Sequence, residues 1–261
     1  MAAGRPSHQS AFVLHQWDWS ETSLILDLFT REQGRLAVVA KGAKRPYSQL
    51  RSVLMPFQRL QVQTSKPKSD DGADILNLRS AEYAGAGATL PPDKLVTGFY
   101  LNELLLKLLA RGDAHERLFD AYSSTLQALA VADDESPLRA FELTLLRETG
   151  VLPEWRCITA TQDSVEPAGR YQMRPEAGLV RAPADEPAID GRSCLALEAA
   201  LAGPDMPALR RACQPVLPAL RLGLRALLAY HLGSPPLRTR QMMLDVRRLL
   251  DARPSTPQGT P

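Results

Sequence analysis

The chain has 261 residues, 44% of them hydrophobic and 23% charged, a composition typical of a soluble globular protein with one or two domains. Its net charge is only +2, yet residues 31–68 contain nine Lys or Arg residues against a single acid, Glu32. No run approaches 18 uninterrupted apolar residues, so a membrane span is not expected. The three cysteines are widely spaced, which argues against a disulfide framework and favours a cytoplasmic setting.

The N-terminal third of the chain is predicted to consist of short strands. Residues 1–10 lack an apolar signal core and are expected to form a disordered lead rather than an export signal. Apolar stretches separated by turn signals then predict five strands. These strands are 11–17, 22–29, 35–41, 58–64 and 74–80. Five strands of about seven residues, with no helix of useful length among them, favour a small barrel over a sandwich.

The remainder of the chain is predicted to be mainly helical. Pro91, Pro92 and Asp93 form a helix-start signal, and Gly150 is a C-terminal cap signal. The predicted helices are 94–110, 114–131, 137–149, 195–202, 205–232 and 236–252. The expected class is therefore α+β and multidomain. Its predicted parts are a barrel over 11–84, a helical domain over 85–150 and 195–252, an insertion over 151–194 that lacks helical periodicity, and a disordered tail over 253–261.

The basic segment "GRLAVVAKGAKRPYSQLR" (34–51) begins as a strand and ends as a cationic loop. Such charge suits a polyanion, because a barrel with a cationic face is a recurring way to bind single-stranded nucleic acid. Tyr47 lies in the polar loop and is a candidate for stacking on bases, whereas Phe29 and Phe57 lie in apolar strand patterns and are expected in the core. The alternative is a solvated face that binds nothing.

The sequence contains no recognisable catalytic motif. It has no phosphate-binding glycine loop, no nucleophile elbow and no H-E-x-x-H. The paired acids Asp70-Asp71 and Asp133-Asp134-Glu135 lie in polar turns and are expected to be solvated. The four histidines show no ligand spacing, and Cys194 and Cys213 fall in predicted helices as core thiols. These patterns predict a protein that is not an enzyme.

The string "WSETSLILDLFTREQGRLAVVAKGAKR" (19–45) resembles the N-terminal signature of the RecO family of bacterial recombination mediators. The similarity continues, in family order, through "LRSAEY" (78–83), "YLNELLLKLL" (100–109), "LRAFELTLLRETG" (138–150) and "LGSPPLRTRQMM" (232–243). It covers nearly the whole chain apart from the lead and the tail. The resemblance implies an N-terminal OB-fold barrel and a helical domain that is interrupted, in many members, by a zinc-ribbon-like region.

This sequence departs from the family pattern in that region. Of two expected C-x-x-C pairs only Cys157 is present; Ala160 takes the place of its partner, and residues near Arg181 and Ala184 replace the second pair. A structural zinc site needs four ligands. Residues 151–194 are therefore expected to be a degenerate zinc-ribbon-like insertion, with no bound metal or other cofactor.

RecO-like proteins bind single- and double-stranded DNA and anneal complementary strands. With RecR, they help to load the recombinase RecA onto strands coated by single-stranded DNA-binding protein. The resemblance implies this role in recombinational DNA repair, in the cytoplasm and at the nucleoid during repair. The predicted DNA-binding residues are Arg31, Arg35, Lys41, Lys44, Arg45, Tyr47 and Arg51. The C-terminal arginines are expected either to extend this track or to receive an acidic peptide.

The resemblance also implies that the helical domain captures the acidic, apolar-ended C-terminal tail of the single-stranded DNA-binding protein. Such a peptide needs an apolar groove and a cation for its carboxylates. Arg139, with Leu138 and Phe141 beside it, is the candidate site. Two other interpretations stay open: a nucleic-acid-processing enzyme with an unrecognised site, and a scaffold without DNA contacts of its own.

Overall fold

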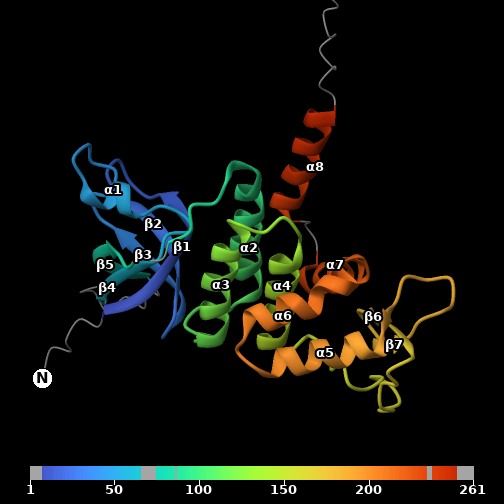
Figure 1. Cartoon of the computed structure of the whole chain (residues 1–261). Helices are drawn as coiled ribbons and strands as arrows, with labels where there is room; N and C mark the ends of the chain where they lie inside the picture. Colours follow the sequence, from blue (N-terminus) through green and yellow to red (C-terminus); the bar gives the residue numbers. More distant parts are fainter. Residues whose placement is uncertain (1–7, 66–74, 86, 234–236, 252–261) are drawn as a thin grey trace, which may run out of the picture.

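A computed structural model describes residues 8–65, 75–85, 87–233 and 237–251 and shows a barrel beside a helical domain (Figure 1). The predicted tail and most of the predicted lead lie outside the described residues. His8–Ser10, which the sequence analysis assigned to the lead, instead belong to the first strand. Within the described residues, no helix has the length and apolar character needed to cross a membrane.

The five strands of the N-terminal part close into a barrel in the order β1-β2-β3-β5-β4. They are β1 (His8–Asp18), β2 (Leu24–Thr30), β3 (Gly34–Ala40), β4 (Leu60–Ser65) and β5 (Ile75–Tyr83). Neighbouring strands are antiparallel except β3 and β5, which run parallel, and β1 pairs with β4 to close the barrel. The prediction of a five-stranded barrel is confirmed, and each predicted strand overlaps an observed one.

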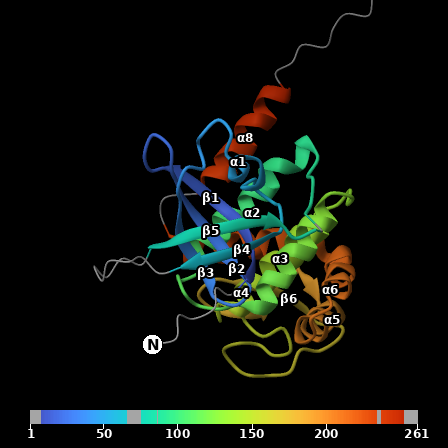
Figure 2. The same ribbon diagram turned by 90° about the vertical axis from the view of Figure 1, so that its left-hand side faces the viewer.

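The first two strands bury side chains on both faces. Val13 and Leu28 point into the barrel core, whereas Phe12, Leu14 and Phe29 belong to the core shared with the helical domain. Alternation of side chains along a strand produces this division. Figure 2 shows the barrel in front of the helices, with α2 and α3 behind it. One outer face of the barrel is therefore covered, and only the rest can receive a ligand.

A short helix, α1 (Gln49–Val53), follows β3 and was not predicted from the sequence. Leu50 and Val53 on this helix pack against the barrel core. The helix therefore covers one end of the barrel. Arg51 lies on its exposed side.

The helical domain is built around one enclosed helix, α4. Its elements are η1 (Pro92–Lys94), α2 (Leu95–Leu108), α3 (Glu116–Leu129), α4 (Ser136–Glu148), α5 (Gly191–Ala202), α6 (Met206–Cys213), η2 (Gln214–Val216), α7 (Leu217–Leu232) and α8 (Arg238–Asp251). Every residue from Ser136 to Leu146 is buried, as expected for a helix surrounded by others. The predicted helix over 205–232 is instead α6, η2 and α7. Pro215 and Pro218 lack a backbone N–H and interrupt the helical hydrogen bonding there.

Residues 151–190 form a small lobe with a three-stranded sheet in the order β7-β6-β8. Its strands are β6 (Arg170–Arg174), β7 (Gly178–Arg181) and β8 (Ile189–Asp190). Trp155 and Tyr171 are fully buried there and join the core of the helical domain. The lobe thus shares its apolar core with the helical domain. Among the described residues no group of three or more His, Cys, Asp or Glu could hold a metal, so the residues present do not fit a zinc ribbon.

Candidate nucleic-acid interface

The basic loop, residues 41–48, leaves β3 at one end of the barrel and is held there by apolar anchors. Ala43 is 1% exposed and lies in the barrel core. Leu50, on α1, packs against the same core. A hydrogen bond from Arg45 N to Gly42 O (3.1 Å) tightens the loop into a turn. Because the apolar residues turn inward, the charged side chains between them face solvent.

Three predicted cations are exposed at this end of the barrel: Lys41, Arg45 and Arg51. Among the described residues, none of the three has an ion-pair partner. Tyr47 stands between them and is 99% exposed. Lys44 differs, because its Nζ lies 3.1 Å from a carboxylate oxygen of Asp18. The structure therefore brings together four of the seven predicted DNA-binding residues as an exposed group, with Lys44 beside them and partly neutralised.

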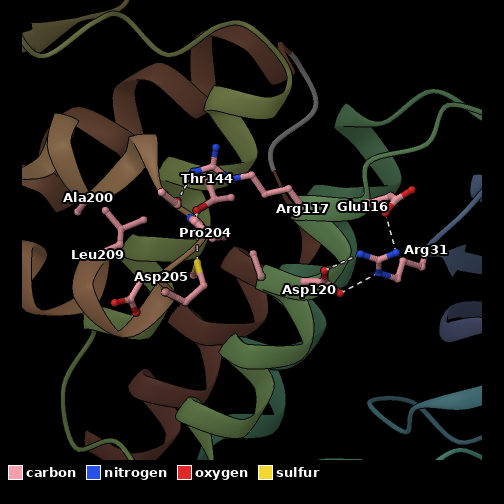
Figure 3. Close-up of a pocket in the computed structure, with 12 residues that line it drawn as sticks. Arg31, Glu116, Arg117, Asp120, Thr144, Ala200, Pro204, Asp205 and Leu209 are labelled. Carbon is pink, nitrogen blue, oxygen red and sulfur yellow. Dashed lines mark hydrogen bonds and ion pairs between the residues drawn. The ribbon is translucent and has the colours of Figure 1, made fainter.

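Arg31 does not present a free cation, which corrects its predicted role. Its guanidinium donates two hydrogen bonds to Asp120 (3.1 and 3.0 Å) and lies 2.6 Å from Glu116. Both carboxylates are on α3. Figure 3 shows them with Arg31 in the lining of a pocket of about 310 Å³. Arg31 therefore links the barrel to the helical domain.

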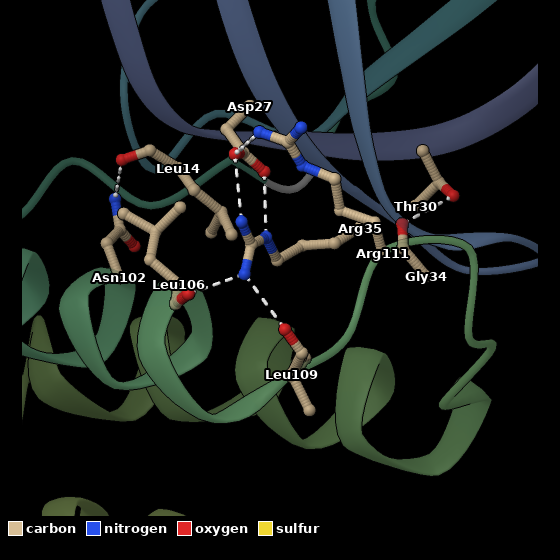
Figure 4. Close-up of polar contacts among 9 residues, drawn as sticks. All are labelled: Leu14, Asp27, Thr30, Gly34, Arg35, Asn102, Leu106, Leu109 and Arg111. Atoms are coloured by element: carbon tan, nitrogen blue, oxygen red, sulfur yellow. Dashed lines mark hydrogen bonds and ion pairs between the residues drawn. The ribbon is translucent and has the colours of Figure 1, made fainter. Parts of the chain in front are cut away.

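Arg35 is enclosed at the same junction with its guanidinium bonded to protein groups, so the structure does not support its predicted DNA contact. Its guanidinium donates to both carboxylate oxygens of Asp27, at 2.9 and 3.1 Å, and to the backbone carbonyls of Leu106 and Leu109 at the end of α2 (Figure 4). The Asp27 side chain is 1% exposed and that of Arg35 12%. Arg111 adds a second, longer contact to Asp27 at 3.4 Å.

The junction is reinforced by close backbone approach and by a buried amide. Gly34 has φ +66°, and a Cβ at this position would lie 1.7 Å from the carbonyl oxygen of Asp113, so only glycine fits. The Asn102 side chain donates to the Leu14 carbonyl at 3.0 Å and accepts from the Tyr122 hydroxyl at 2.5 Å. These contacts join the barrel and the helical domain into one unit.

A second candidate surface is a groove of about 1070 Å³ in the helical domain, between α2, α4, α7 and α8. Leu138 and Leu228 contribute to its apolar lining, and Arg225 and Arg240 to its charged lining. Neither of these two arginines has an ion-pair partner among the described residues. Glu103 fixes the α8 wall of the groove, because its carboxylate accepts hydrogen bonds from the first backbone N–H groups of that helix.

The three residues predicted to bind a peptide are divided by the structure. Leu138 and Arg139 line the groove. Phe141 is 0% exposed and packs against Tyr122, so the structure does not support its predicted contact with a peptide. The Arg139 guanidinium is already bound to the Glu142 carboxylate and lies 3.3 Å from that of Glu135. Its charge is therefore largely compensated.

Glu142 is an unusual carboxyl group in the floor of this groove. Its side chain is 1% exposed, and burial raises its pKa above the ordinary value although hydrogen bonds from Arg139 and Tyr100 act in the opposite direction. Burial, followed by the charge of Glu142, likewise raises the pKa of the Tyr100 hydroxyl. Arg139, Tyr100 and Glu142 thus form a buried polar cluster that stabilises the groove.

Two exposed tryptophans beside the basic loop were missed by the sequence analysis. Trp17 is 42% exposed and Trp19 is 62% exposed, at the end of β1 and in the loop that follows it. The sequence indicated this exposure through the string "WDWS" (17–20), which places two tryptophans at the end of a strand and directly before a turn.

The fold and its exposed cations define a class of protein: a closed five-stranded OB-like barrel, with a basic loop end, fixed to an α-helical domain. Residues 5–83 match the family described as Recombination protein O N terminal, and residues 92–241 match Recombination protein O C terminal. The chain belongs to the RecO family.

Individual relatives are similar over almost their full length. The DNA repair protein RecO of Acidovorax ebreus is 47% identical, over 95% of this chain and all of the relative. Those of Albidiferax ferrireducens and Variovorax paradoxus are each 46% identical, over 95% of this chain and 99% of the relative.

Proposed function

We propose that this protein is a non-enzymatic recombination mediator in DNA repair, which binds single- and double-stranded DNA through the loop end of its barrel. It anneals complementary strands and, with RecR, helps to load RecA onto strands coated by single-stranded DNA-binding protein. The family match supports the repair role. The observation that carries the DNA-binding role is the group of three exposed cations, Lys41, Arg45 and Arg51, beside Tyr47.

The physical basis is counterion release. Each Lys or Arg that neutralises a phosphate releases condensed cations, which makes affinity steeply salt-dependent and largely independent of sequence. Neutralised phosphates also repel one another less, so two complementary strands approach more easily. Annealing therefore requires charge and exposure rather than a reacting group.

The test replaces Lys41, Arg45 and Arg51 together with Ala. At about 0.7 per phosphate contact on single strands, the slope of log affinity against log salt should fall by about two. The matched control replaces three exposed arginines of the distant lobe and α5, Arg156, Arg174 and Arg192, and should leave the slope unchanged. Equal loss in both variants would mean that overall charge, and not this loop, determines binding; an unchanged slope in both would move the DNA track to the C-terminal arginines.

The groove supports capture of the acidic C-terminal tail of single-stranded DNA-binding protein. It offers leucines for an apolar end and the two unpaired arginines, Arg225 and Arg240, for carboxylates. Replacing both with Ala should weaken binding of a labelled tail peptide at least ten-fold, while Arg192→Ala, outside the groove, should not. Arg139→Ala is a poor test, because it leaves the Glu142 carboxyl buried without its partner. Unchanged peptide affinity in the double variant would remove the groove from the proposal.

The enzymatic alternative has a direct assay as well. A labelled oligonucleotide incubated with the protein and Mg²⁺ or Mn²⁺ should remain intact while it is bound and annealed. Cleavage at a rate proportional to protein concentration, and lost in a variant of an acidic cluster, would replace the mediator role with a nuclease role.

A further inference from the structure

Two tryptophans occupy the end of the barrel in a way that the core does not require. The chain has three tryptophans; Trp155 is fully buried, whereas Trp17 and Trp19 are 42% and 62% exposed. Leaving two large rings partly in water forgoes the stabilisation that burial would provide. An aromatic pair held at a rim commonly serves recognition.

The Trp17 ring and the Trp19 backbone each have a neighbour that positions them. Trp17 lies opposite Ile25 in the β1–β2 register, and Ile25 lies opposite Val39 in the β2–β3 register. These three residues therefore form a row across the outer face of the first three strands. The His15 ring meets the Trp17 ring edge-on at 4.5 Å between centroids. In the loop beyond, Trp19 N donates to Ser23 O at 3.2 Å.

The tryptophan loop and the basic loop form one continuous surface. Lys44 connects them: its backbone N donates to Thr22 O at 3.0 Å, and its Nζ donates to Ser20 O at 3.2 Å. Gly42 N adds a bond to the Ser23 hydroxyl at 3.5 Å. Figure 1 shows the β1–β2 loop and α1 at the same end of the barrel. Lys44 also neutralises Asp18, the acid between the two tryptophans, which leaves the exposed Glu21 as the one acid of residues 17–23 without an ion-pair partner among the described residues.

We infer that Trp17 and Trp19 stack on unpaired bases of single-stranded DNA whose phosphates are held by the basic loop. This inference rests on the proposed DNA binding and makes it specific. Stacking on aromatic rings is available only to bases that are not already stacked in a helix. The two rings therefore favour single strands over duplex, whereas the cations of the basic loop serve both.

The experiment compares Trp19→Ala, Trp17→Ala and the parent on oligothymidine and on a duplex of equal length. Each variant should bind the single strand about 5- to 150-fold more weakly, the range that corresponds to loss of one stacked base. Duplex affinity should change less than about two-fold. The salt slope should stay at the parental value, because no cation is removed. Trp19→Phe should recover most of the affinity, since it restores a ring.

Tryptophan emission provides a second measurement on the unlabelled full chain. Oligothymidine should quench the parent, and the quenching should be lost stepwise in the two variants. In a variant with both Trp17 and Trp19 replaced by Ala, the remaining signal comes from Trp155, which is fully buried in the small lobe and reports whether the fold is intact. Parental oligothymidine affinity in both variants, with the salt slope still dependent on the basic loop, would overturn the stacking role and leave the proposed DNA binding standing. Absence of binding by the parent would overturn both.

Discussion

Asp27→Ala should strongly destabilise the protein, because it removes the one acidic partner that the enclosed Arg35 has among the described residues. The Asp27 side chain is 1% exposed and accepts two hydrogen bonds from Arg35, whose side chain is 12% exposed. Removing one member of a buried pair costs about 3–5 kcal/mol. Two backbone carbonyls continue to accept from Arg35, so the expected loss is near the lower bound, about 3 kcal/mol.

Urea unfolding followed by circular dichroism measures this loss. Arg111→Ala is the matched control: it removes another contact to the same carboxylate, but its side chain is 48% exposed, so the loss should stay under about 1 kcal/mol. Replacing Asp27 with Leu and Arg35 with Met together should recover much of the stability, because both desolvated charges disappear. A loss under 1 kcal/mol for Asp27→Ala would refute the enclosed pair as the connection between barrel and helices.

Three further predictions concern the helical domain. Glu103→Gln should weaken the N-terminal cap of α8, because the backbone N–H and the hydroxyl of Thr239 both donate hydrogen bonds to the Glu103 carboxylate. Hydrogen exchange of the α8 amides should become faster, while that of the α4 amides should not change. Burial alone would raise the pKa of Glu198. Hydrogen bonds from the Arg147 guanidinium and from the backbone N–H of Trp155 outweigh this effect and hold the pKa below its ordinary value. The stability it contributes is thus fully present above the ordinary glutamate pKa of about 4.3 and is lost as pH falls through the lowered one, so the deficit of Glu198→Gln at pH 7 should shrink below pH 4. Elemental analysis of protein purified without chelator should show no stoichiometric zinc; one zinc per chain would require ligands outside the expected pairs.

The barrel and most helices follow from local pattern. Period-2 alternation and turn residues place the five strands, because each strand has one face in the barrel core. The apolar residues of 94–110 wrap most of that helix and predict burial in a bundle; α2 contributes several residues to the shared core, but it leaves Leu95 and Phe99 exposed. The break at η2 was not predicted within the helix over 205–232. Proline is tolerated in the first turn of a helix, so Pro215 and Pro218 are compatible with a helix start as well as with an interruption.

Charge pairing across the chain was not predictable in the same way. Arg31 and Arg35 look like their neighbours Lys41 and Arg45 in the sequence. Their carboxylate and carbonyl partners lie on α2, α3 and β2, as far as 89 residues away for the Arg31–Asp120 contact. Nothing in a linear pattern specifies which cations will meet such partners. A count of basic residues therefore overstates the exposed charge of the segment.

The polar contacts between barrel and helices have a consequence for how a coated strand would be engaged under the proposed function. Because these contacts join the two parts, the groove and the loop end of the barrel are carried on one unit. Under the proposed function, a strand covered by its binding protein presents both ligands of these surfaces at once, and capture of a tail peptide makes the DNA contact an intramolecular event. Effective local concentrations for such tethered contacts reach the millimolar range. That gain depends on the spacing of tail and strand, and a variant with a weakened Asp27–Arg35 pair should bind each ligand alone as before yet lose the advantage of binding both.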